Sequence, residues 1–424
     1  MKNFKDYLKL DLKLHLKMHG GFTVFLLLSL LGIIRVLRQS VPGHYRIFTG
    51  AARALWNFES PHGTDFGTGV GYWFYSPSCG LYFFKFFELF PEKLGLSIYS
   101  ALSIFLLAFG INRFLTVLKK DDTVPVFKIR SLLIKNTIYL LISPMVLLGV
   151  TNSKPEIIMT GILFLGSSLL LQRRNEGVEK FTENKRIIVA SLLLSMILVW
   201  KYQPLPSLGL LSLAWIFTKR TFKFPALLFF FTLFWIVSPL IILPFSLVTQ
   251  IYSDLTNTFS TFISAAWMNF DSIFTFIVHG LHVDLSYSMT QPLSAFIAAA
   301  LVFGIYRLRM KSFAELTLYS LCFGALFTAT LSPLSQNNSY AILFPFLLGN
   351  VAIMVDTENR PGTIVKTGFI ILILILFFGY SDIMPKNLKG EVRKLGLKPV
   401  ALFIFGIVLF VNRLKLPRRS VVQL

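Results

Sequence analysis

The chain has 424 residues, of which 54% are hydrophobic and only 14% are charged. This composition excludes a soluble globular protein, because too little polar surface is available to cover a globule, and it predicts an all-α polytopic membrane protein. The formal net charge of +21 does not indicate nucleic-acid binding, since the basic residues stand in short clusters beside apolar segments, where they contact anionic headgroups. We therefore expect membrane lipids, and no nucleic acid, as partners.

Apolar segments recur at the length that a helix needs to cross the hydrocarbon core, and they predict about twelve transmembrane helices, with a range of about eleven to thirteen. The predicted spans cover residues 22–38, 93–117, 133–150, 154–172, 187–200, 203–218, 223–244, 289–306, 312–331, 337–355, 364–380 and 399–412. Between them lie a first outer loop over residues 39–92 and a large outer loop over residues 245–288.

The basic residues indicate which side of the membrane each loop occupies. Residues 1–21 are rich in lysine and are expected in the cytoplasm, whereas no Lys or Arg lies between Lys223 and Arg307. Because cytoplasmic loops hold the basic residues, that stretch should face outward. The basic loop 381–398 disagrees, since counting spans places it outside. Either one of the last helices is miscounted or this loop is an exception.

Each long outer loop contains a segment that suits the membrane surface. The apolar segment Ser76–Phe90 is short and carries Lys85 and Glu88 on one helical face. This favours a helix at the outer interface or re-entering from it, with two short spans as the alternative. Over Thr256–Val278, apolar and aromatic residues recur at helical spacing and predict an amphipathic helix on the outer leaflet. Ordinary packing against the bundle is the alternative there.

The unusual polar residues outside the spans all fall on the outer side. They are His44, Arg46, Arg53, Glu59, His62 and Asp65, the turns 151–156 and 201–204, Asp254, Asp271, His279, His282 and Asp284, and the turn 332–340. A transporter would place polar residues within its spans and on broken helices. The predicted spans are mostly free of charge, which indicates chemistry at the outer surface.

Several short motifs occur in a shared order and on this same side. They are Tyr45-Arg46-Ile47-Phe48 followed by Ala51-Ala52-Arg53-Ala54-Leu55, then Tyr75-Ser76-Pro77, Lys201-Tyr202-Gln203-Pro204-Leu205-Pro206, and Leu331-Ser332-Pro333-Leu334-Ser335 with Tyr340 and Phe344-Pro345. Together they resemble the GT-C glycosyltransferases, and more narrowly glycosyltransferase family 87, whose characterised members are polyprenyl-phosphate-mannose-dependent mannosyltransferases. The resemblance implies a GT-C-like catalytic domain over residues 22–355, followed by C-terminal transmembrane helices over residues 356–424.

The resemblance also implies a carboxylate general base at the mouth of the first outer loop, four residues before the aromatic residue that matches Phe48. That position holds His44 in this chain. A lipid-phosphate sugar donor already has a leaving group, so inverting transfer needs one base for the acceptor hydroxyl and cations for the departing phosphate. The candidates for the base are Asp65, Glu59 and His44, and Asp65 lies in a glycine-rich segment that is equally typical of a turn.

The candidate cations for the donor phosphate are Lys201, Arg46 and Lys154. Lys201 ends a predicted span, where a lysine can also simply extend to the headgroups. Arg46 can likewise anchor an interfacial helix. The candidate substrate-binding residues are Gln203, Asn337, Asn338 and Tyr340, although the asparagines equally suit a helix cap.

No cofactor or metal is expected, because a polyprenyl-phosphate donor does not require one. The pattern His279-x-x-His282-x-Asp284 is a weak metal signal, and Cys79 and Cys322 do not form a cysteine zinc site or a disulfide framework. The sequence thus predicts transfer of a sugar from a polyprenyl phosphate to a lipid-linked or cell-envelope glycan outside the cell membrane. A glycan polymerase or ligase, a transporter or flippase, and a non-catalytic family member are the alternatives.

Overall fold

The computed structural model describes residues 2–38, 41–64, 66, 75–172, 180–266, 272–331, 341–355, 362–378 and 397–415. All regular secondary structure in these ranges is helical, which confirms the all-α prediction. Six helical segments are long and apolar enough to cross a membrane. They lie in α1 (Lys2–Arg38), α4 (Glu92–Lys119), α5 (Pro125–Thr151), α9 (Lys223–Val237) with its extension Ser238–Ile241, α12 (Tyr287–Arg307) and α13 (Phe313–Leu331). The chain is therefore an integral membrane protein.

Helices also occupy the other predicted spans. They are α6 (Glu156–Leu171), α7 (Lys180–Trp200), α8 (Leu205–Lys219), α14 (Phe344–Met354), α15 (Thr363–Phe378) and α17 (Leu397–Lys415). Several of these are shorter than a full crossing or carry charges near one end. The total of about twelve spans stays a prediction. The basic loop 381–398 falls almost wholly outside the described residues.

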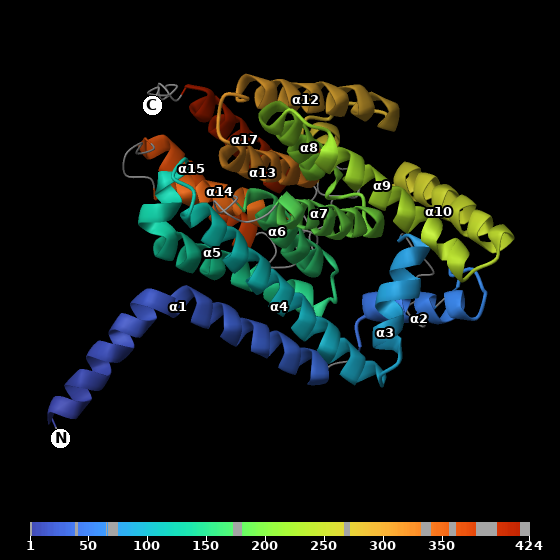
Figure 1. The fold of residues 1–424 in the computed structure, drawn as a ribbon, viewed down its shortest axis with the longest axis horizontal. Helices are drawn as coiled ribbons and strands as arrows, with labels where there is room; N and C mark the ends of the chain where they lie inside the picture. The colour runs from blue at the N-terminus through green and yellow to red at the C-terminus, as the bar shows by residue number, and fades with distance from the viewer. Residues whose placement is uncertain are drawn as a thin grey trace.

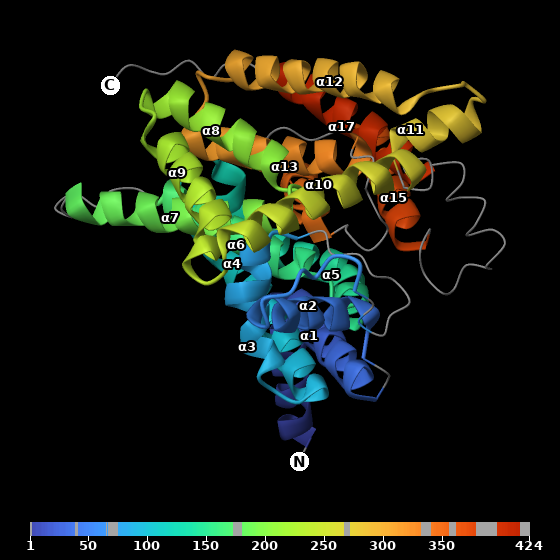
Figure 2. The same cartoon turned by 90° about the vertical axis from the view of Figure 1, so that its right-hand side faces the viewer.

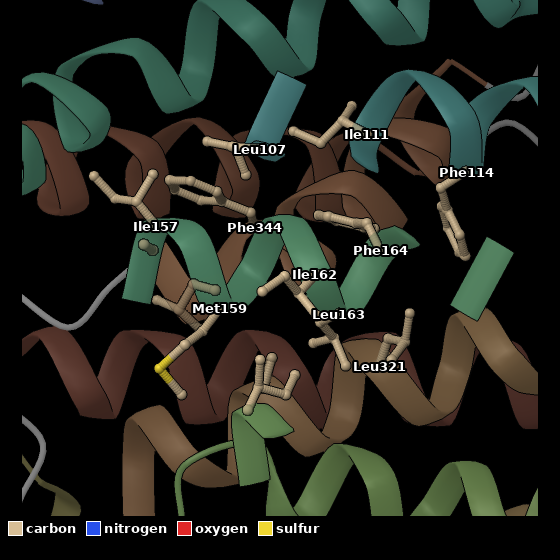
Figure 3. Close-up of a cluster of buried hydrophobic side chains, with 14 of the residues drawn as sticks. Leu107, Ile111, Phe114, Ile157, Met159, Ile162, Leu163, Phe164, Leu321 and Phe344 are labelled. Carbon is tan, nitrogen blue, oxygen red and sulfur yellow. The ribbon is translucent and has the colours of Figure 1, made fainter. Parts of the chain in front are cut away.

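Helix α6 lies at the centre of the bundle and is buried along nearly its whole length. It packs against α4 and α7, and apolar side chains such as Ile162 and Phe164 fill the space around it (Figure 3). The contact with α4 depends on glycine. A Cβ atom on Gly161 would lie 2.6 Å from the backbone of Leu106, and one on Gly110 would lie 2.2 Å from the Gly161 oxygen. Small residues at such positions let membrane helices approach closely.

The helices of the first outer loop gather at one end of the bundle, near α10 (Figure 1). Helix α2 (Gly43–Trp56) buries one face, where the Phe48 ring lies 4.4 Å from the ring of Phe84. Phe84 ends a short π-helical segment, Cys79–Phe84, that continues into α3 (Lys85–Glu88). The predicted Lys85–Glu88 pair forms at 2.7 Å. This helical segment is far too short to cross a bilayer twice, so the alternative of two short spans is wrong.

The large outer loop differs from the prediction in the extent of its helix. Helix α10 runs over Phe245–Ala266, about three turns earlier than expected. Ser272 is extended and caps a separate short helix, Ile273–Thr275, which continues as a π-helical turn to Gly280. A single helix over residues 256–278 is therefore wrong. Figure 2 shows α10 running across the bundle.

Candidate functional site

Three of the predicted outer turns meet at one end of the bundle. The turn between α5 and α6 carries Lys154, and Glu156 begins α6. The chain reverses there because Ser153 adopts a positive φ of 54°, and the Lys154 amide donates a hydrogen bond to the Gly149 carbonyl at 2.9 Å. Lys201 directly follows the last residue of α7. The third contribution, His44, comes from the first turn of α2.

These four residues, His44, Lys154, Glu156 and Lys201, form what we call the cationic cluster. The Lys201 ammonium lies 2.5 Å from Oε1 of Glu156, and the Lys154 ammonium lies 2.8 Å from Nε2 of His44. The Glu156 side chain is fully buried and that of Lys201 is 20% exposed. Lys154 is also buried, whereas His44 lies at the rim with only part of its surface covered. The ring of Tyr75 lies 5.9 Å from the Lys201 ammonium.

The protonation states give the cationic cluster an excess of positive charge. Partial burial, and then the charge of Lys154, lower the pKa of His44 to about 4, so its imidazole is neutral at pH 7. Burial lowers the pKa of Lys154 to about 8 against the opposing attraction of Glu156, so that this lysine is still mostly protonated at pH 7. Among the described residues, two ammonium groups therefore face a single carboxylate.

Helix α6 adds to this field, because its N-terminus points its partial positive charge at the same place. A buried excess of charge is unfavourable unless a counter-charge neutralises it. Asp65, the remaining first-loop candidate for the base, lies outside the described residues. Among the described residues, the cationic cluster is thus built to bind an anion beside a neutral imidazole, which is a proton acceptor.

The polar turn 332–340 also lies outside the described residues, and Asn337, Asn338 and Tyr340 with it. Its two ends are nevertheless held close to the cationic cluster. On one side, Thr328 donates a hydrogen bond of 2.8 Å to the Gln203 carbonyl, two residues beyond Lys201. On the other side, Thr160 of α6 donates one of 3.1 Å to the Ala341 carbonyl. Gln203 is buried, and its side-chain oxygen has no hydrogen-bond partner among the described residues.

Two predicted site residues lie apart from the cationic cluster. Arg46 faces the other side of α2 and forms an ion pair with Glu92 at 2.8 Å. Both lie on a cleft of about 480 Å³ that Arg53 also lines. Glu59 is exposed beyond the end of α2, roughly 20 Å along that helix from His44. His44 and Glu59 therefore do not serve the same reacting centre in this arrangement.

Glu156 is the member of the cationic cluster that the sequence alone does not place in the site. Its signal was the run Lys154-Pro155-Glu156, which puts a lysine and an acid at the start of a very apolar helix. A buried carboxylate in that position needs a partner, and Lys201 provides it. No group of at least three His, Cys, Asp or Glu side chains suited to a metal is found in the described ranges, which include His279, His282 and Asp284.

No family model, curated protein or solved structure matches this chain.

Proposed function

We propose that this protein is a GT-C-type membrane glycosyltransferase. It transfers a sugar, mannose by resemblance to family 87, from a polyprenyl phosphate to a lipid-linked or cell-envelope glycan. One observation carries the proposal: the cationic cluster sets two ammonium groups beside a neutral imidazole at the exit of the first span. The positive-inside rule supports a cytoplasmic N-terminus and a cationic cluster on the outer face of the cell membrane.

The proposed reaction is a single inverting displacement. The acceptor hydroxyl oxygen attacks the anomeric carbon from the face opposite the phosphate, while the bond from that carbon to the phosphate oxygen breaks. The bonding electron pair leaves with the polyprenyl phosphate, which gains one negative charge. Lys154 and Lys201 stabilise that charge, because positioned cations act most strongly where charge develops. Glu156 holds Lys201 in place.

His44 is the proposed base. Its pKa of about 4 is close to that of an ordinary carboxyl group, about 4, so it takes the part of the acid that the family carries at this position. In the absence of donor, Nε2 accepts a hydrogen bond from Lys154. When the donor phosphate accepts that bond instead, Nε2 becomes free to take the proton of the acceptor hydroxyl. The role of the phosphate is then both to bind and to release the base.

The test uses the purified full chain with a polyprenyl phosphate that carries a radiolabelled sugar, in a membrane extract that supplies the acceptor. We expect Lys154→Met and Lys201→Met to lower transfer about 100-fold or more, in line with the loss of transition-state charge stabilisation. Lys93→Met is the matched control, since Lys93 is an exposed lysine at the start of α4. Wild-type transfer by both cluster variants would refute the proposal.

A further inference from the structure

A polar cavity of about 260 Å³ lies at the end of the bundle opposite the cationic cluster. Helix α6 begins at the cationic cluster and ends here, where Gln172 follows its last turn. The cavity is lined by Glu183 and Arg186 near the start of α7, by Trp215 and Lys219 near the end of α8, and by Asp121 beyond the end of α4. Nothing in the proposed sugar transfer uses these residues.

Two hydrogen-bond donors on the cavity wall have no partner in the part of the chain that the structure describes. Trp215 is only 3% exposed, and its Nε1 has no hydrogen-bond partner among the described residues. Nε of Arg186 is likewise buried and has no hydrogen-bond partner among the described residues. Another nitrogen of the same guanidinium donates to the Gln172 carbonyl at 2.8 Å. A buried donor without a partner costs free energy. With the ammonium of Lys219 on the same wall, these groups suit the oxygens of an oxyanion.

The cavity wall also carries acidic residues, and these restrict the chemical class of ligand that the cavity can bind. Asp121 is buried, and its carboxylate accepts hydrogen bonds from the amide and hydroxyl of Thr123. Glu183 is half-buried on the α7 side. The formal charges of the two acids cancel those of Arg186 and Lys219. A purely anionic ligand would be repelled by the carboxylates, whereas a molecule with both a phosphate and an ammonium group would satisfy both sets.

We propose that this cavity binds the headgroup of a zwitterionic aminophospholipid of the phosphatidylethanolamine type. Its phosphate oxygens accept hydrogen bonds from Trp215 and Arg186, and its ammonium group donates to Glu183. A membrane lipid is favoured because the cavity lies at the end rich in basic residues, which the positive-inside rule assigns to the cytoplasmic headgroups. Apolar residues, among them Leu169, Ile187 and Phe313, also line the cavity, and they suit the apolar part of a lipid rather than a fully polar solute.

The test reconstitutes the full chain into nanodiscs of phosphatidylcholine that contain small, equal fractions of phosphatidylethanolamine and phosphatidylglycerol. Native mass spectrometry then counts the lipid that stays bound. We expect phosphatidylethanolamine to be retained in preference to both other lipids. Trp215→Phe should lower that retention about three- to tenfold, as expected for the loss of one buried hydrogen bond. Glu183→Gln should reduce the preference over phosphatidylcholine, because a neutral amide oxygen accepts a hydrogen bond from the ethanolamine ammonium group more weakly than a carboxylate does, and the choline headgroup has no N–H to donate to either.

The matched control is Trp235→Phe, because Nε1 of Trp235 is also buried with no partner among the residues described, but Trp235 does not line this cavity. It should leave lipid retention unchanged. Thermal unfolding of each variant without added lipid separates loss of binding from loss of fold. A second arm of the experiment adds soluble glycerophosphoethanolamine as a competitor of the bound lipid. Displacement of the lipid at micromolar concentration would assign the site to a cytosolic solute. Equal retention of all three lipids, or retention unchanged in both Trp215→Phe and Glu183→Gln, would overturn the proposal.

Discussion

The ion pair between Glu156 and Lys201 should be strongly coupled, and a double-mutant cycle measures that coupling. At their separation of 2.5 Å, the Coulomb attraction is about 7 kcal/mol for an effective dielectric constant of about 20. The cost of burying both charges offsets much of this attraction. Removal of one partner is nevertheless severe, because the other charge stays buried without it. Glu156→Gln and Lys201→Met should each lower the free energy of unfolding by about 3–5 kcal/mol.

The double variant should be less destabilised than the sum of the single variants, by about 1–3 kcal/mol, because no uncompensated partner of the pair remains. Equilibrium unfolding in mixed detergent micelles measures the free energy of unfolding of the wild type, the two single variants and the double variant. The pair of Arg46 and Glu92 is the control, since it has a similar separation of 2.8 Å but side chains that are 39% and 43% exposed. Its coupling should be only about 0.2–1 kcal/mol. Additivity within about 0.5 kcal/mol at Glu156 and Lys201 would refute a buried, mutually dependent pair.

Four further outcomes are expected. His44→Asp should retain the rate of sugar transfer, because it restores the acid implied by the family resemblance, whereas His44→Ala should lower that rate about 100-fold or more. An equal loss of transfer in both variants would show that His44 is not the base. Binding of polyprenyl phosphate should weaken from pH 7 to 9 as Lys154 loses its proton near pH 8, while Lys154→Arg, which stays charged, should bind equally at both pH values. Over about pH 8 to 10 the free energy of unfolding should rise instead, because the pKa of Lys154 is lower in the native state than in the unfolded chain, so the native state binds fewer protons. Gly161→Ala should destabilise the bundle by about 1–3 kcal/mol, since its Cβ would lie 2.6 Å from the α4 backbone. The control Gly209→Ala, whose Cβ would meet no atom within 4 Å, should be neutral or stabilising. Equal effects of the two substitutions in a thermal unfolding assay would contradict the close packing of α4 and α6.

The helices and the gathering of polar turns at one end of the bundle could be predicted, because hydropathy and the placement of lysine and arginine are local properties of the sequence. The partners within the site could not. Lys154 and His44 are 110 positions apart, and no spacing rule says which outer lysine faces which outer acid. The role of Glu156 is not predictable for the same reason, since it depends on Lys201, which lies beside it only in the folded chain.

The error in the large outer loop has a different cause. The aromatic spacing over residues 256–278 continues the period of a helix across Ser272, although Ser272 is a capping residue. Ser272 accepts a hydrogen bond from the Thr275 amide, which is the usual way in which serine begins a new helix. Pro244, directly before α10, was likewise a signal for an earlier start. Capping residues in this loop thus carried more information than the apolar pattern.

The shortness of α6 sets where a lipid-borne substrate would meet the cationic cluster. Its 16 residues give a length of roughly 24 Å, whereas the hydrocarbon layer is about 30 Å thick. If the end near Gln172 sits level with the inner headgroups, Glu156 lies several ångströms beneath the outer ones. A long-chain isoprenoid could then deliver its phosphate sideways from within the leaflet, and the thickness of the surrounding bilayer would govern how easily it arrives.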